Sequence, residues 1–148
     1  MAEWPDYGRG TEEDRRKYAE LIKLHAYNRN FITRDQEMKI LEDGVSRFRI
    51  NLDESRGILL SVTGANDIAL ENEVQRTAKQ MLQNSAYPKK RIARRDFDQV
   101  VAYYRSRARG ALSDEDVRKR VKGLADDLDL KPKRSGLILR TRRWYRSI

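Results

Sequence analysis

Basic side chains are the residues of this sequence whose number and spacing best support a chemical role. Residues 85–148 hold 19 basic and 8 acidic side chains, whereas residues 1–84 hold 13 and 15. Lysine and arginine at this density can neutralise several phosphates or carboxylates of one partner. The candidate residues for binding an anionic partner are Lys89, Lys90, Arg91, Arg95, Arg105, Arg109, Lys131, Lys133, Arg134, Arg140, Arg142, Arg143, Trp144, Tyr145 and Arg146.

The last part of the chain carries the strongest form of this signal. Residues 131–148 contain seven basic side chains and no acidic one. At 100° per residue, a helix from about Gly136 would place the arginines opposite an apolar face. That apolar face would hold Leu137, Ile138, Trp144, Tyr145 and Ile148. The sequence therefore predicts a basic amphipathic arm over 131–148, with the ordinary alternative that its charges are simply solvated.

Catalytic and metal-binding patterns are weak in comparison. The chain has no cysteine and one histidine, His25, so thiolate metal sites and cysteine nucleophiles are excluded. His25 lies on an apolar stripe with no nucleophile at a recognised spacing, which favours a place at the edge of the core. A calcium loop counted from Asn28 would have Lys39 at its twelfth position, where a glutamate is needed. We therefore expect no catalytic residue, no metal and no cofactor, although the aspartates at 126–129 leave a divalent cation as an alternative.

The elements that must position the basic residues are predicted to be helices. Apolar residues recur at the i, i+3, i+4, i+7 spacing of a buried helical stripe, and strand-like alternation is absent. Thr33 and Gln36 form a capping-box pattern, and Thr11 and Ser113 are good N-caps. The expected helices begin near Thr11, Thr33, Asp53, Asp67, Arg94 and Ser113, with a seventh in the tail. The expected core contains Leu21, Ile22, Leu41, Phe48, Val74, Phe97, Val101, Val121 and Leu124.

The sequence also contains an internal similarity at an offset of 80 residues. Residues 21–50 and 101–130 both read as a helix, a short polar connection, an N-cap and a second helix. Two such αα-hairpins would pack face to face, because neither can bury its apolar stripe alone. The expected fold is therefore an all-α, compact bundle of six to seven helices built from two degenerate αα-hairpin copies. It would occupy residues 1–130, with residues 1–10 extended, and residues 131–148 would form the basic arm.

One pattern within these hairpins resembles a known family. The stretches Ala26…Ile32-Thr33-Arg34-Asp35 and Ala108…Leu112-Ser113-Asp114-Glu115 resemble the TerB-like helical domain, named for tellurite resistance, over about residues 14–130. The resemblance implies a helical bundle in a stress or defence system that docks on other proteins. It also implies an acidic turn that binds a divalent cation. Here the turns read Asn28-Arg29-Asn30 and Arg107-Ala108-Arg109-Gly110, so arginines stand where that site would need acids.

These observations favour a non-enzymatic binding module whose partner is nucleic acid or an acidic protein assembly. The alternatives are a TerB-like protein–protein scaffold and a peripheral adaptor at a membrane surface, and no small-molecule substrate is evident. No stretch approaches the roughly 18 apolar residues that span a bilayer. The first thirty residues contain no apolar signal-peptide core. We therefore expect a cytoplasmic protein.

Overall fold

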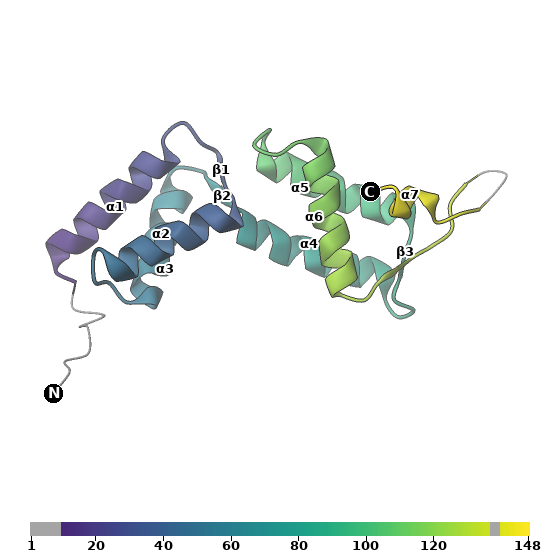
Figure 1. Ribbon diagram of the computed structural model, residues 1–148, viewed down its shortest axis with the longest axis horizontal. Coiled ribbons are helices and arrows are strands. Elements are labelled where there is room, and N and C mark those ends of the chain that lie inside the picture. The colour runs from purple at the N-terminus through teal and green to yellow at the C-terminus, as the bar shows by residue number, and fades with distance from the viewer. Residues whose placement is uncertain (1–9, 137–139) are drawn as a thin grey trace. The chain divides into compact units, whose positions relative to one another are not determined.

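The computed structural model describes residues 10–136 and 140–148, and helices dominate these residues (Figure 1). Helices make up 67% of the described residues, which confirms the all-α prediction of six to seven helices. Leu137 and Ile138, which were expected on the apolar face of the arm, lie outside the described residues. The helices are α1 (Glu12–Ala26), α2 (Arg34–Ser46), α3 (Leu52–Ala65), α4 (Glu71–Ala86), α5 (Arg94–Ala108), α6 (Asp114–Asp127) and α7 (Arg143–Arg146).

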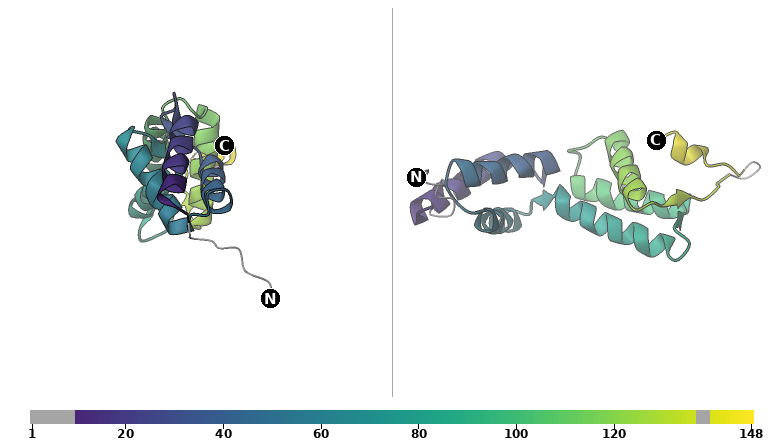
Figure 2. Two further views of the ribbon diagram at one scale, coloured as in Figure 1. Left: turned by 90° about the vertical axis from the view of Figure 1, so that its left-hand side faces the viewer. Right: turned by 60° about the horizontal axis from the view of Figure 1, so that its bottom comes forward.

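The chain divides into two compact units, one ending at Glu71 and the other beginning at Asn72. The sequence pattern predicted one domain to residue 130, followed by an arm. In the first unit, α1 and α2 both pack on α3 (Figure 2). In the second unit α5 packs on α6, and the described part of residues 131–148 belongs to this unit. The seventh helix is the single turn Arg143–Arg146, not a longer helix from Gly136.

Side-chain caps explain where several helices begin. Thr33 Oγ1 accepts from the Gln36 amide at 3.3 Å, while Gln36 Oε1 accepts from the Thr33 amide at 3.0 Å. This is the predicted capping box, and Thr11 and Asp14 form a second one at α1. Ser113 accepts from the Asp116 amide at 3.1 Å and starts α6 as predicted. Such caps satisfy amide donors that the helix itself leaves unpaired.

The segments that connect the helices contain four two-residue strands, which the sequence did not predict. These strands form one pair in each unit. β1 (Phe31–Ile32) pairs in parallel with β2 (Ala69–Leu70), and β3 (Arg91–Ile92) pairs in parallel with β4 (Lys131–Pro132). Two residues are too short to show the apolar–polar alternation by which strands are recognised in a sequence. Each pairing nevertheless joins chain segments about 40 residues apart.

The same order of five elements occurs twice. Helix, strand, helix, helix and strand run from α1 to β2 and again from α4 to β4. α2 begins at residue 34 and α5 at residue 94, a spacing of 60 (94 − 34), and α1 and α4 end at 26 and 86 with the same spacing. The offset of 80 found in the sequence aligns only residues 21–50 with residues 101–130. A spacing of 60 to 62 residues aligns all five elements of the first set with those of the second.

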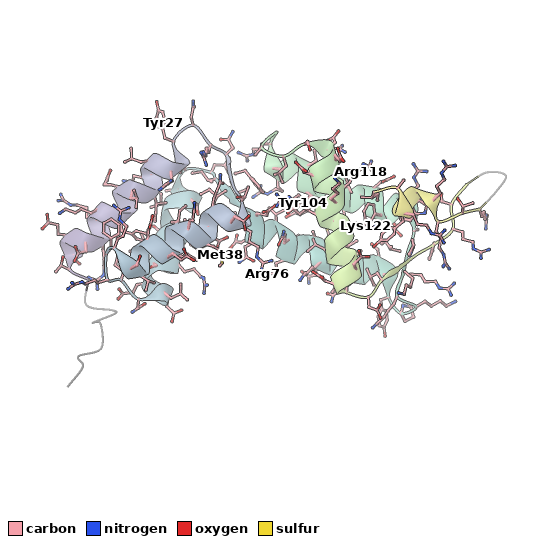
Figure 3. The ribbon with its side chains drawn as sticks, viewed as in Figure 1. Tyr27, Met38, Arg76, Tyr104, Arg118 and Lys122 are labelled. Atoms are coloured by element: carbon pink, nitrogen blue, oxygen red, sulfur yellow. The ribbon has the colours of Figure 1, made fainter. Side chains whose placement is uncertain are left out.

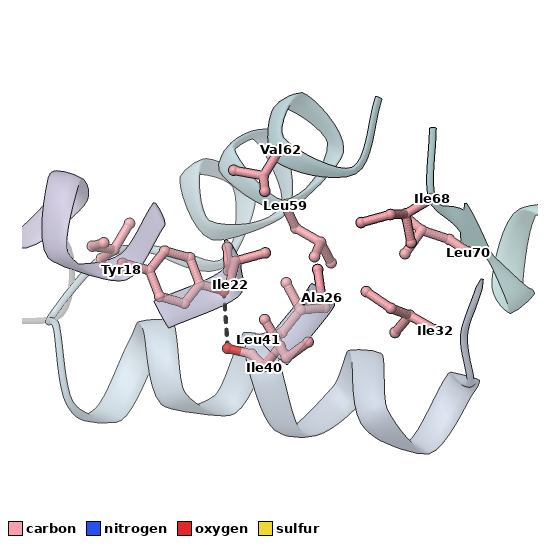
Figure 4. Packing of buried hydrophobic residues seen from close by; sticks show 11 residues of the cluster. Tyr18, Ile22, Ala26, Ile32, Ile40, Leu41, Leu59, Val62, Ile68 and Leu70 are labelled. Atoms are coloured by element: carbon pink, nitrogen blue, oxygen red, sulfur yellow. Dashed lines mark hydrogen bonds between the residues drawn. The ribbon is translucent and has the colours of Figure 1, made fainter. Parts of the chain in front are cut away.

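The core of the first unit forms where α1, α2 and α3 meet (Figure 4). Ile22 and Leu41 are buried there as predicted, whereas Leu21 and Phe48 are only half-buried. Met38 of α2 is 56% exposed, and His25, which was expected at the edge of the core, is exposed as well. In contrast, Glu71 of α4 is buried. Its carboxylate accepts a hydrogen bond from the Arg34 amide at 2.9 Å.

The two units carry their buried tyrosines on different helices. At the spacing of 60, Tyr18 of α1 corresponds to Ala78 of α4, and Gly44 of α2 corresponds to Tyr104 of α5. Both tyrosines are 0% exposed. In the first unit, a Cβ atom on Gly44 would lie 2.7 Å from Tyr18 Cζ, so α2 has room only for glycine beside this ring. The second unit keeps a large and a small residue at these positions but reverses which helix carries each.

Tyr18 makes the first unit sensitive to alkaline pH. Its hydroxyl donates to the Ile40 carbonyl at 2.9 Å, and burial raises the pKa of Tyr18 to about 12. The unfolded chain ionises this group near pH 10, so its contribution to stability is complete below pH 10 and is lost as the pH rises towards 12. We expect Tyr18→Phe to be less stable than the parent at pH 8, and the difference in unfolding free energy to narrow above pH 10. Tyr27→Phe, at an 80% exposed position, is the control, and a difference for Tyr18→Phe that stays constant with pH would contradict the prediction.

Candidate anion-binding surface

The β3–β4 pair brings two separate basic runs together in the second unit. Arg91 lies opposite Lys131 in the parallel register. The amide of Lys131 donates to the Lys90 carbonyl at 2.8 Å, and that of Lys133 donates to the Ile92 carbonyl at 2.8 Å. The basic run at residues 89–91 and the start of the predicted arm at residue 131 therefore lie side by side. Their separation of about 40 residues in the sequence does not indicate this proximity.

Three aromatic rings attach the end of the chain to α5. The ring centroid of Phe97 lies 5.5 Å from that of Trp144 and 5.9 Å from that of Tyr145, both in edge-on geometry. Trp144 Nε1 donates to the Lys133 carbonyl at 2.9 Å. These contacts fix the segment that carries Arg142, Arg143 and Arg146 against the second unit.

Tyr145, one of the predicted binding residues, is buried and hydrogen-bonded within the second unit. It is 7% exposed, and its hydroxyl donates to the Asp126 carboxylate on α6. Burial raises the pKa of Tyr145, and the neighbouring Asp126 carboxylate raises it further. Lys122 Nζ lies 4.9 Å from the centre of the ring, so α6 supports Tyr145 with a cation as well as a carboxylate.

Most of the predicted tail residues surround two adjoining hollows. One has a volume of about 620 Å³ and the other about 430 Å³, and both are lined by Arg134, Arg140 and Arg142. No carboxylate side chain among the described residues lines either hollow. We call their basic lining the arginine surface, which consists of Arg91, Lys133, Arg134, Arg140, Arg142, Arg143 and Arg146.

Other predicted site residues do not line these hollows. Arg105 and Arg109 lie at the far end of α5, and a 15-residue helix is about 22 Å long. Arg105 Nε is 2.6 Å from Asp114 Oδ1, which neutralises much of its charge, and Lys131 Nζ is 3.6 Å from Asp129 Oδ1. Lys89, Lys90 and Arg95 are exposed, but they line neither hollow. Arg95 therefore lies at one end of α5, and Arg105 and Arg109 lie at the other.

A third hollow is lined by two arginines that the sequence did not predict as site residues, Arg94 and Arg118. It has a volume of about 790 Å³, and Arg94 from α5 and Arg118 from α6 line it together with Arg143 and Trp144. Arg94 and Arg118 approach the same carboxylate, that of Asp98, at 3.9 Å and 3.2 Å. The i, i+4 spacing of Arg94 and Asp98 could have indicated one of these pairs, but only the packing of α6 brings Arg118 to the same place.

The described residues contain no group of three or more histidine or carboxylate side chains that could hold a metal ion. Within the same residues, no helix is long and apolar enough to cross a membrane. No protein-family model, no curated protein and no solved structure matches the chain.

Proposed function

We propose that this protein is a non-enzymatic module that binds nucleic acid through the arginine surface of its second unit. The observation that carries this proposal is the gathering of seven basic side chains around two adjoining hollows whose described lining includes no carboxylate side chain. None of the seven forms an ion pair with another described residue, so their charges are not neutralised within this part of the chain. An anionic partner would supply the missing counter-charge.

The kind of side chain favours phosphate as the bound group. Six of the seven are arginines, whose planar guanidinium groups bind phosphate through paired hydrogen bonds. Arg91 lies in a two-residue strand, Arg143 and Arg146 lie in a four-residue helix, and the other four residues lie in connecting segments. None of these elements has the length to read bases from the major groove. The proposed contacts are therefore to the phosphate backbone, and binding depends little on sequence.

Removing charge from the arginine surface tests the proposal. We expect a variant with Arg134→Gln, Arg140→Gln and Arg146→Gln, all at exposed positions, to bind a labelled oligonucleotide more weakly in fluorescence anisotropy. Each lost phosphate contact lowers the slope of log K against log salt by about 0.7–0.9, so the slope should fall by about 2–3. Circular dichroism should show an unchanged helix content.

The matched control removes three exposed arginines elsewhere in the chain. Arg16→Gln, Arg76→Gln and Arg107→Gln change the net charge by the same amount but leave the arginine surface intact. We expect this variant to keep most of the parent's affinity and its salt slope. Equal losses in the two variants would show that net charge alone drives binding. If the parent binds acidic polypeptide or anionic vesicles but no nucleic acid, the proposed function is wrong.

A further inference from the structure

The hollow of about 790 Å³ differs from the arginine surface in having an aromatic wall. Trp144 forms part of this wall, and hydroxyl groups of Ser135, Thr141 and Ser147 add polar groups that can donate or accept hydrogen bonds. Its volume lies within the roughly 300–1,000 Å³ of sites that take small organic groups. Arg143 and Thr141 line both this hollow and the hollow of about 430 Å³, so this hollow is continuous with the arginine surface.

The charges around this hollow favour an anion. Arg94, Arg118 and Arg143 line it, and Asp98 offsets part of the first two because it approaches both. Glu115 also lines it, but Lys119 Nζ lies 2.9 Å from the Glu115 carboxylate. Ile148 lines the hollow too, and its backbone oxygen accepts a hydrogen bond from Lys122 Nζ at 3.4 Å. The guanidinium of Arg143 has no carboxylate partner among the described residues.

The indole of Trp144 is held in a fixed orientation. Its Nε1–H is engaged by the Lys133 carbonyl, and the rings of Phe97 and Tyr145 meet it edge-on at 5.5 Å each. Trp144 is nevertheless only half-buried, and its remaining surface lines the hollow. A preorganised aromatic ring beside arginines is the arrangement that stacks an unpaired base while cations hold the adjoining phosphate.

We infer that this hollow takes an unpaired nucleotide, with its base on Trp144 and its phosphate at Arg118 and Arg143, so that the protein prefers single-stranded nucleic acid to duplex. This inference rests on the proposed function, because the strand that enters the hollow also crosses the arginine surface. A duplex cannot fill the hollow in this way, since its bases are paired and stacked on one another. Duplex has the higher charge density, so phosphate contacts alone would favour it.

The fluorescence of Trp144 gives a direct test. The chain has two tryptophans, so Trp4→Phe leaves Trp144 as the single indole. We expect a 12-nucleotide oligothymidylate to quench this emission on binding, whereas a hairpin duplex with the same number of phosphates does not. In anisotropy at equal salt, the single strand should bind about tenfold more tightly than the duplex. Trp144→Leu should abolish this preference, and Trp144→Phe should retain part of it.

A second variant covers the case in which Trp144→Leu fails to fold. Arg118→Gln alters a partly exposed side chain on α6 and should lower single-strand affinity more than duplex affinity. Arg76→Gln removes the same charge from the exposed face of α4 and should leave the ratio unchanged (Figure 3). Equal binding of both forms without quenching would overturn this inference and leave the proposed function standing. Binding of neither form would overturn both.

Discussion

Phe97→Ala is expected to lower the free energy of unfolding of the second unit by about 3–5 kcal/mol. Phe97 is 0% exposed, and its ring contacts both Trp144 and Tyr145. Alanine would leave a cavity beneath both aromatic rings, so the cost includes lost burial and lost ring contacts. Chemical denaturation monitored by circular dichroism measures this change.

Phe97→Ala also tests whether residues 144 and 145 stay packed against α5, and this can be measured separately from unfolding. We expect Trp144 emission to shift to longer wavelength in the Trp4→Phe background, because the indole loses one of its neighbours. Tyr87→Ala, at an 84% exposed position in the same unit, is the control and should change the unfolding free energy by less than about 0.5 kcal/mol. A loss below about 1 kcal/mol for Phe97→Ala would mean that this ring does not hold the core and the chain end together.

Gly44→Ala should destabilise the first unit although it adds only one methyl group. The new Cβ would lie 2.6 Å from Ser55 Oγ and 2.7 Å from Tyr18 Cζ, both closer than real Cβ contacts allow. Adding a methyl group to a well-packed core typically costs about 1–3 kcal/mol, and α2 and the Tyr18 ring must move apart here. Helix propensity alone would favour alanine by about 1 kcal/mol, so a net loss of stability identifies the clash.

A double-mutant cycle assigns the cost to Tyr18. In a Tyr18→Ala background the ring is absent, and we expect Gly44→Ala to be neutral or slightly stabilising. The coupling energy between the two substitutions should exceed about 1 kcal/mol in unfolding measurements. Additive effects would show that Ser55 or the backbone, rather than the Tyr18 ring, determines the need for glycine.

Local signals in the sequence predicted the helices well. Capping at Thr11, Thr33 and Ser113 depends on residues within one turn, and the buried stripe of Val117, Val121 and Leu124 follows from helical spacing. Leu21 and Phe48 were expected in the core but are half-buried, because the sequence shows the spacing of a stripe but not which neighbouring helix covers it.

The candidate site depends on contacts that no local pattern contains. Arg91 and Lys131 become neighbours only through a two-residue parallel pairing, and Arg118 reaches Asp98 only through the packing of α6 on α5. The repeat was also difficult to detect. Tyr18 of the first copy corresponds to Ala78 of the second, and Gly44 corresponds to Tyr104. The two copies therefore keep one large and one small residue at these two positions, but the residues themselves differ.

The buried carboxylate of Glu71 has a consequence for any attempt to divide this chain. β2 ends at Leu70 and α4 begins at Glu71, so no linker separates the first set of five elements from the second. A fragment that stopped at Leu70 would contain all five elements but would lose the acceptor of the Arg34 amide at the start of α2. The first unit therefore includes Glu71, which is the first residue of α4. A fragment meant to fold alone must extend at least to Glu71.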